Sequence, residues 1–306
     1  MKVVVVGAGA VGGYFGGRLQ EAGFDITFLV RKKRAEQLRE HGLIIQSPAG
    51  NVQLTPKLAE DAGQIGACDL VLLAVKNYHL QPLIESIRPL VEQGAKVLPL
   101  LNGFEHFDIL AQAFGKQAIL GGLCQIIVTL NDDGHIIHTS KIHDIFFGAL
   151  ETEQAEFCQQ FAKQVKGAVM PVTLSKDVLV DLWSKYAFIT AFSGVTTASR
   201  LPINEILKVD ATKNVYRLLL TEMRTLATIK GIALPADFVE KTMERMSALP
   251  DESTSSMHQD FRKGLPLEVE SLQGAAVRLS QQTKVNLPTI TTIYGLIKPY
   301  EQGTIN

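Results

Sequence analysis

The chain has 306 residues, enough for two domains and a substantial buried core. Apolar residues make up 46% and charged residues 20%, and a net charge of −1 gives no electrostatic reason to expect nucleic acid or an anionic membrane as partner. Three scattered cysteines without a CxxC pair favour a reduced, cytoplasmic setting over a disulfide framework.

The chain begins with a short β-branched run, "KVVVV", which predicts a strand buried on both faces of a parallel sheet. A G-x-G-x-x-G motif follows at once and precedes an amphipathic helix that ends near Gly23. Such glycines allow a tight turn, room for a pyrophosphate and close packing of helix on strand. We therefore predict a dinucleotide site at the helix N-terminus, the alternative being a glycine-rich turn without ligand. Its residues are Gly7, Ala8, Gly9, Ala10, Val11 and Gly12.

The second predicted strand, "DITFLV", ends in a basic run instead of an acidic residue. In NAD enzymes a carboxylate usually closes this strand and binds the ribose 2′-hydroxyl. Here the run is "RKKR", residues 31–34, and a guanidinium can bind a 2′-phosphate through two hydrogen bonds. We predict NADP as the cofactor and Arg31 as its phosphate contact; the alternative is a solvated basic helix start.

Two later strands end in polar residues. The run "DLVLLAV" ends at Lys76, and "AKVLPLL" ends at Asn102. Ligands of open α/β sheets bind outside the carboxyl ends of the strands, so both side chains are predicted to face the nucleotide. The alternatives are an exposed loop cation and an ordinary Asn-Gly turn.

The remainder of the first half is predicted to be β-structure. A small hairpin is expected around 48–51, followed by three antiparallel strands at 118–130, 135–140 and 144–150. Three histidines in this region suit strands and turns better than a metal site, so no metal is predicted. The dinucleotide-binding domain is expected to span residues 1–168.

The second half, residues 169–306, reads as a helical domain after a crossing segment at 169–175. On its first helix, Lys185, Ile189 and Ser193 are spaced four apart and share one face. Lys185 is the only charged residue from Leu182 to Ser199, and burying an ammonium group beside aromatic rings is costly. The predicted helices are 177–197, 216–234, 238–249, 271–285 and 291–301.

A polar stretch, "STSSMHQDFRKGLPLEVE", contains Ser256 and Glu268. Pro266 is expected in the first turn of the next helix, which would put Glu268 in that turn as well. There the helix dipole favours its ionised form. The alternative is simple helix capping by Glu268, with solvated serines.

Together these residues resemble the ketopantoate reductase (2-dehydropantoate 2-reductase) family over essentially the whole chain. The resemblance implies an α/β fold in which an N-terminal Rossmann-type dinucleotide-binding domain is followed by an all-helical C-terminal domain. It rests on "GAGAVG", Arg31, "LLAVKNYH" with Lys76, "LLNGFE" with Asn102, "LWSKYAF" with Lys185, and the spacing of Ser256 and Glu268.

The resemblance also implies roles. Lys185 would be the general acid that protonates the substrate carbonyl, and Glu268 would act beside it, in contact with cofactor and substrate. Lys76 and Asn102 would bind the cofactor, with Asn102 also near the substrate, and Ser256 would help to hold the substrate. The alternative for Lys185 is a non-catalytic lysine whose side chain extends to the surface.

The implied activity is NADPH-dependent reduction of 2-dehydropantoate to (R)-pantoate, in pantothenate and coenzyme A biosynthesis. Family members carry substrate-binding asparagines four and eight residues after the lysine, where this chain has Ile189 and Ser193. Ser193 is assigned to substrate binding by this position. Another branched 2-oxo acid as substrate, or a non-catalytic NADPH sensor, therefore stays open. The partner is a small 2-oxo acid, and a homodimer is possible.

Overall fold

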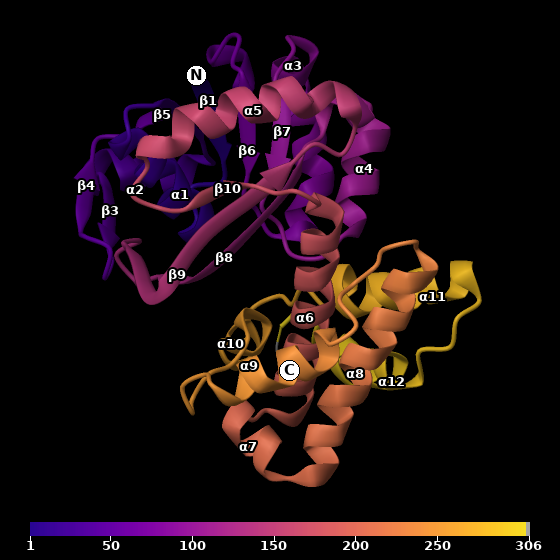
Figure 1. Ribbon diagram of the computed structural model, residues 1–306. Helices are drawn as coiled ribbons and strands as arrows, with labels where there is room; N and C mark the ends of the chain where they lie inside the picture. Colours follow the sequence, from indigo (N-terminus) through magenta and orange to yellow (C-terminus); the bar gives the residue numbers. More distant parts are fainter. Residues whose placement is uncertain (304–306) are drawn as a thin grey trace. The chain divides into compact units, whose positions relative to one another are not determined.

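The computed structural model describes residues 1–303, which form two compact units (Figure 1). The sheet unit comprises residues 1–101 and 106–178. The helical unit comprises the short segment 102–105 together with the chain from residue 179 onward. Each unit has its own hydrophobic core.

The sheet unit is built around a five-stranded parallel sheet with strand order β5-β2-β1-β6-β7. β1 lies at its centre, and its valines from Val3 to Val6 are buried, as the unbroken β-branched run predicts. The strands are β1 (Lys2–Val6), β2 (Asp25–Leu29), β5 (Lys57–Ala59), β6 (Leu70–Leu73) and β7 (Lys96–Pro99). The connecting helices are α1 (Ala10–Glu21), α2 (Lys32–His41), α3 (Leu80–Glu92) and α4 (Glu105–Phe114).

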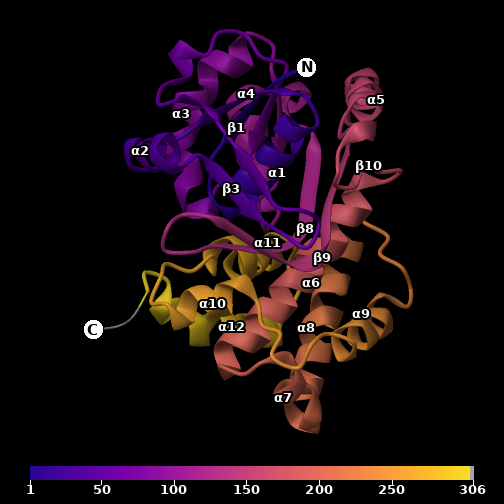
Figure 2. The same cartoon turned by 90° about the vertical axis from the view of Figure 1, so that its left-hand side faces the viewer.

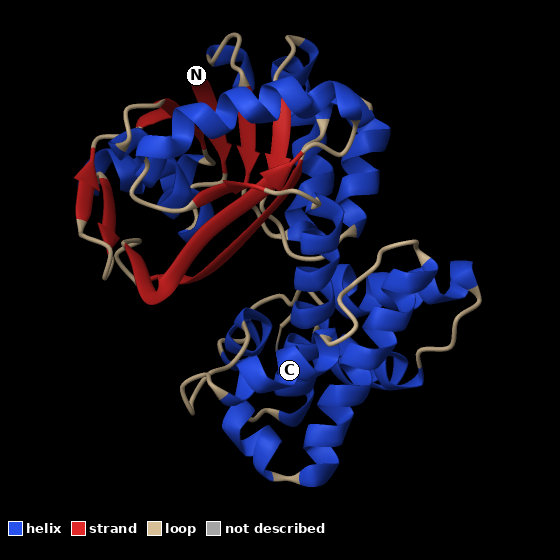
Figure 3. Ribbon diagram, viewed as in Figure 1, coloured by secondary structure: helices blue, strands red, loops and turns tan. Residues whose placement is uncertain are grey.

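A second five-stranded sheet completes the same unit (Figure 3). Its strands are β3 (Leu43–Gln46), β4 (Val52–Leu54), β8 (Gly121–Leu130), β9 (Ile136–Gly148) and β10 (Val172–Leu174). β3 and β4 form the predicted hairpin, and β8 pairs with β9 in antiparallel fashion. The two strands predicted for 135–140 and 144–150 are one strand, β9, because its pairing with β8 continues past a register shift between Ile126 and Val128.

The sheet unit ends ten residues later than the sequence suggests, at Val178 instead of residue 168. The reason is β10, which pairs in parallel with β9 and therefore belongs to the second sheet. The amide of Ser175 also donates to the carbonyl of Phe147. A helix that the sequence analysis did not identify, α5 (Ala155–Gln164), packs against β9 and β10.

The helical unit is formed by α6 (Val178–Ser199) and the helices that follow it (Figure 2). Two of these, α7 (Ile203–Lys208) and α10 (Ser256–Arg262), were not predicted, because helices of two turns or fewer show too little periodicity. The others are α8 (Asp210–Ile229), α9 (Phe238–Ser247), the π-helix η6 (Glu270–Gly274), α11 (Ala275–Thr283) and α12 (Pro288–Ile297). Short 3-10 helices cover Ala62–Gln64, Asn77–His79, Lys116–Ala118, Thr152–Gln154, Val165–Gly167 and Lys298–Tyr300.

The helix α6 is long and apolar enough, by length and composition alone, to cross a membrane. Yet 61% of its most apolar stretch is buried inside the protein. Its side chains Trp183, Tyr186 and Phe192 form part of the core of the helical unit. This burial is the pattern of a core helix.

Close packing of the glycine-rich turn depends on Gly12. A β-carbon at Gly12 would overlap the carbonyl oxygen of Gly7 and lie 3.0 Å from Cβ of Ala74. A β-carbon at Gly9 would meet no atom within 4 Å. The two glycines of this motif therefore have different roles. Gly12 is required for close packing of the turn, whereas Gly9 leaves open space beside the helix N-terminus.

We expect Gly12→Ala to lower the free energy of unfolding by ~2–3 kcal/mol, because a backbone atom must move to admit the methyl group. Gly9→Ala, its matched control, should cost less than about 1 kcal/mol. Urea unfolding followed by circular dichroism measures both. Equal losses in the two variants would contradict this account of the turn.

Two buried histidines of β9, His138 and His143, contact Tyr14 of α1. The Tyr14 hydroxyl lies 2.6 Å from Nδ1 of His143, and Ser47 lies 2.8 Å from Nδ1 of His138. Burial lowers the pKa of both imidazoles, and the nearby guanidinium of Arg18 acts in the same direction. A hydrogen bond from His138 to a backbone carbonyl and the carboxylate of Asp144 beside His143 oppose this shift in pKa.

The folded protein therefore favours neutral imidazoles, whereas the unfolded chain takes up protons below its ordinary histidine pKa of 6.5. Stability should be full above that pH and fall as the pH drops below 6.5. We expect the melting temperature to fall less over this range in the double variant His138→Gln/His143→Gln.

Candidate active site

The loop between β1 and α1 has the geometry of an anion-binding turn. Gly7 has a left-handed φ of +92°, and its amide donates to the carbonyl of Leu29, 3.2 Å away. Gly9 is the N-cap of α1, no side chain caps this helix end, and its first turn has no acidic residue. Amide donors, a positive helix end and the space beside Gly9 together fit a pyrophosphate. The dinucleotide predicted from the motif therefore fits these residues.

Arg34 holds this loop in place, a role that the sequence analysis did not assign. Its Nε donates to the carbonyl of Ala8 over 2.8 Å, and its Nη1 donates to the carbonyl of Gly134 over 3.0 Å. Burial lowers the pKa of this guanidinium. Arg31, by contrast, is the exposed N-cap of α2, just after β2. No sequence pattern distinguishes these two arginines, because the partners of Arg34 are backbone carbonyls distant in the chain.

Lys76 lies three residues beyond the end of its strand, whereas the sequence predicts a strand that runs up to it. β6 pairs with β1 and ends at Leu73, and Lys76 precedes the 3-10 helix Asn77–His79. The pKa of His79 is lowered by burial and then by the positive charge of Arg31. The positive charge of Arg31, at the end of β2, therefore acts electrostatically on His79 in the segment after β6. This is expected for strands whose carboxyl ends share one edge of the sheet.

Asn102 follows β7 in the chain but belongs to the helical unit. Its Nδ2 donates to Oε2 of Glu268 over 3.4 Å. Glu268 is buried, with only 4% of its surface exposed. The structure therefore brings together two of the predicted residues that lie 166 positions apart in the sequence.

The position of Glu268 differs from the prediction. Pro266 precedes the helix instead of opening it, and Glu268 lies in a turn before η6. The Leu267 amide donates to the carbonyl of Glu301, so this part of the chain is held by the C-terminal turn. The carbonyl of Glu268 accepts bonds from the Leu272 amide and from Ser271 Oγ, each over 3.1 Å.

Lys185 lies on α6 between two almost fully buried aromatic residues, Trp183 and Tyr186. It is half-buried, and within the helical unit, as far as residue 303, no carboxylate lies within 4.0 Å of its ammonium group. The Tyr186 hydroxyl donates to the carbonyl of Leu272 in η6 over 2.9 Å. Lys185 and Glu268 therefore stand on, or directly before, two elements that are in contact.

The two serines assigned to the substrate have different surroundings. Ser193 is fully buried; its hydroxyl donates to the Ile189 carbonyl over 2.6 Å and lies 3.1 Å from the Gln273 side-chain amide. Ser256 is exposed at the start of α10. Its neighbour Ser255 is the N-cap and accepts from the amide of His258. The contacts of Ser193 give it a structural role, and its substrate contact remains a prediction without geometric support.

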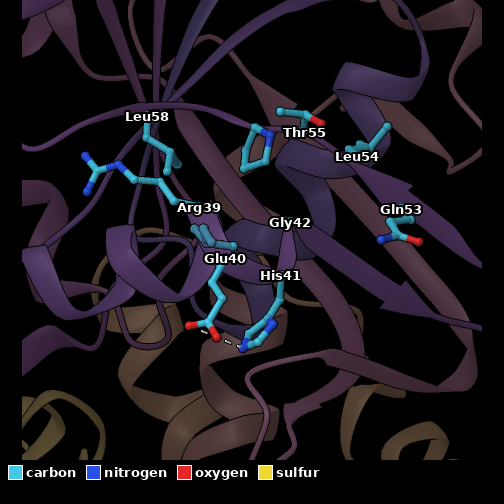
Figure 4. Close-up of a pocket in the computed structure, with 10 residues that line it drawn as sticks. Arg39, Glu40, His41, Gly42, Gln53, Leu54, Thr55 and Leu58 are labelled. Carbon is cyan, nitrogen blue, oxygen red and sulfur yellow. Dashed lines mark ion pairs between the residues drawn. The ribbon is translucent and has the colours of Figure 1, made fainter.

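A surface hollow of about 540 Å³ lies elsewhere in the sheet unit (Figure 4). It is formed by the end of α2 and the region of β4 and β5, and it contains none of the predicted site residues. Glu40 and His41 form an ion pair across 3.8 Å at its rim. Within residues 1–303, no group of three potential metal ligands could hold a metal ion.

Comparison with known proteins follows the two halves of the chain. Residues 3–152 match "Ketopantoate reductase PanE/ApbA", and residues 177–301 match its C-terminal domain. The uncharacterized oxidoreductase YkpB of Bacillus subtilis is 38% identical over 98% of this chain and 99% of its own. The crystal structure of a 2-dehydropantoate 2-reductase from Geobacter metallireducens is 27% identical, with a TM-score of 0.91 over 98% and 99% of the two chains.

A D-mandelate dehydrogenase solved with NADH and anilino(oxo)acetate shares the fold, with a TM-score of 0.89 and 21% identity over 98% of both chains. Matches to both domain types, in order and over nearly the whole chain, agree with the glycine turn, Lys185 and the Asn102–Glu268 pair described above. The chain is an oxidoreductase of the ketopantoate reductase family.

Proposed function

We propose that this protein reduces 2-dehydropantoate to (R)-pantoate with NADPH. The observation that carries the proposal is Lys185, a half-buried ammonium group on an apolar helix, with no carboxylate within 4.0 Å among residues 179–303 of its unit. A structural lysine is usually neutralised or extends to solvent. A lysine held this way suits a proton donor to a developing alkoxide.

In this proposal NADPH supplies the hydride that is added to the carbonyl carbon of the substrate. The ammonium group of Lys185 hydrogen-bonds the carbonyl oxygen, stabilises the negative charge that develops there and donates the proton. Asn102 and Glu268, which lie within hydrogen-bond distance of each other, contact the bound molecules. The turn at Gly7–Gly12 binds the pyrophosphate, with Lys76 as a further contact to the cofactor.

The cofactor preference is assigned from the end of β2. No acidic residue stands there to bind a ribose 2′-hydroxyl, and the exposed Arg31 is available to a 2′-phosphate. Relatives of the same fold have been solved with NADH. The preference for NADPH is thus a property proposed for this chain from Arg31.

The second candidate is reduction of a different branched 2-oxo acid. It is favoured by Ile189 and by Ser193, whose hydroxyl is already hydrogen-bonded within the helical unit. The fold is compatible with more than one substrate class, because function depends on the site and not on the fold. Steady-state oxidation of NADPH with a panel of 2-oxo acids, 2-dehydropantoate among them, decides between the two. The highest kcat/KM for another acid would overturn the first proposal, and no turnover with any acid would favour a sensor.

We expect Arg31→Ala to reduce the preference for NADPH over NADH by about tenfold or more, since a charge-assisted hydrogen bond contributes ~1.5–3 kcal/mol. Lys33→Ala removes an equal, exposed charge from the same helix turn and should leave most of the preference. The measurement is kcat/KM for both cofactors. The assignment fails if the two variants behave alike.

We expect Lys185→Ala to lower kcat by about 10²–10⁴, the usual share of a positioned proton donor. The affinity for NADPH and the melting temperature should change little, because the side chain forms no ion pair with residues 179–303 of its unit. Lys213→Ala, an exposed charge on α8, is the control. Turnover near the wild-type rate in Lys185→Ala would refute the mechanism.

A further inference from the structure

The segment 102–105 leaves the sheet unit, packs into the helical unit and returns. It carries Asn102 at its start and Glu105 at its end. Neither the resemblance nor the proposed mechanism gives Glu105 a role. We infer that an ion pair between Glu105 and Arg278 fixes this segment, so that Arg278 and Glu105 are positioning residues for Asn102.

The ion pair has strong geometry. Arg278 of α11 donates from Nε and Nη2 to the two oxygens of Glu105, over 3.0 and 2.8 Å. Two parallel bonds of this kind restrict the orientation of both partners, which a lysine cannot reproduce. Hydrogen bonding to Glu105 is also the largest contribution to the raised pKa of Arg278. The end of the segment is therefore held at a defined position on α11.

A second carboxylate fixes Arg278 itself. Its Nη1 donates to Oε2 of Glu270 over 2.6 Å, and its Nη2 donates to the Glu270 carbonyl over 2.8 Å. Burial alone would raise the pKa of Glu270, but hydrogen bonds from Lys298, Tyr294 and Arg278 outweigh it and lower this pKa to about 2. Glu270 thus stays ionised at every physiological pH and holds Arg278 towards Glu105.

The middle of the segment is confined by packing. A β-carbon at Gly103 would overlap the backbone carbonyl oxygen of Ser271, so the segment lies directly against η6. The Phe104 ring packs against Trp183, with 5.1 Å between the ring centroids, and stacks on Tyr186 at 6.4 Å. These two aromatic residues flank Lys185 on α6. The segment is therefore held by α6, which carries Lys185, and by η6, which directly follows the turn of Glu268.

These contacts account for the position of Asn102. Its bond to Glu268 is long, at 3.4 Å, and a hydrogen bond of this length orients an amide only weakly. The ion pair three residues further on restricts the backbone from which the amide extends. Loss of the Glu105–Arg278 ion pair should let Asn102 move relative to Glu268. It removes no group that contacts a ligand in the proposed mechanism.

The test is a double-mutant cycle on cofactor affinity. The inference rests on the proposed function, in which Asn102 contacts NADPH, but binding by isothermal titration requires no knowledge of the substrate. We expect Glu105→Gln and Arg278→Lys each to weaken NADPH binding about tenfold, a typical coupling between residues in contact. In an Asn102→Ala background, the same changes should cost less than about twofold.

The matched control is Glu301→Gln. Glu301 pairs with Lys298 over 2.6 Å at the outer end of the same network and does not touch the segment 102–105. Its side chain is changed while its carbonyl still accepts from Leu267. We expect Glu301→Gln to lower the melting temperature about as much as Glu105→Gln, with unchanged affinity for NADPH.

Affinity within twofold of wild type in both Glu105→Gln and Arg278→Lys would overturn the inference. An equal loss with and without Asn102 would also overturn it, because the ion pair would then act on stability alone. If Glu105→Gln does not fold, Arg278→Lys keeps the charge and gives the same cycle. Tight NADPH binding with the expected cycle but no turnover of any 2-oxo acid would reject the proposed substrate and support the inference.

Discussion

Burial of β1 at the centre of a parallel sheet is the constraint on which the site depends. β1 pairs with β2 on one side and β6 on the other, so its valines have no exposed face and the strand cannot shift its register without losing both neighbours. Parallel strands all end at the same edge. Hydrophobic burial of the strands therefore places the glycine turn, Arg31 and Lys76 at one edge of the sheet, and no ligand is needed for this arrangement.

The helical unit is subject to a different constraint, because it contains polar and charged side chains among apolar ones. Lys185 stands among aromatic side chains, and Glu268 is almost completely buried. Glu268 is hydrogen-bonded by Asn102, and the π-helix η6 that follows it contacts both α6, through Tyr186 and Leu272, and the segment 102–105, through Gly103 and Ser271. π-helical turns often occur at functional sites, and here the wider turn accompanies the crowded contacts of Ser271 and Leu272.

Sequence patterns were sufficient for the features that depend on local periodicity. The run "KVVVV", the glycine motif and the apolar length of α6 each predict an element that the structure contains. They were insufficient where distant pairing decides. β10 belongs to the sheet because it lies beside β9, and nothing within residues 172–174 reveals that partner. Pro266 did not open a helix because the Leu267 amide is bonded to Glu301, 34 positions along the chain.

The roles of the site residues stay predictions, but the structure shows which of their surroundings the sequence reveals. Lys185 and Asn102 stand out because a lone charge in an apolar run and an amide at a strand end are visible in the sequence. Arg34 was missed because its partners are the carbonyls of Ala8 and Gly134, and carbonyls leave no trace in residue identity. Ser193 was assigned because it stands where family members carry a substrate-binding asparagine, and its hydroxyl is hydrogen-bonded to Ile189 and Gln273. A matching position in a family does not reveal the hydrogen-bond partners of a replaced residue.

The excursion of residues 102–105 also bears on how this gene can be recombined. Divided by sequence similarity, the chain has one module at 3–152 and another at 177–301. When the chain is divided by packing instead, residues 102–105 of the first module belong to the helical unit. A chimaera that takes only the C-terminal module from a relative would set a foreign Arg278 position against the native Glu105, and a foreign aromatic wall against Phe104. A chimaera that keeps the helical unit intact must therefore also take residues 102–105 from the same relative.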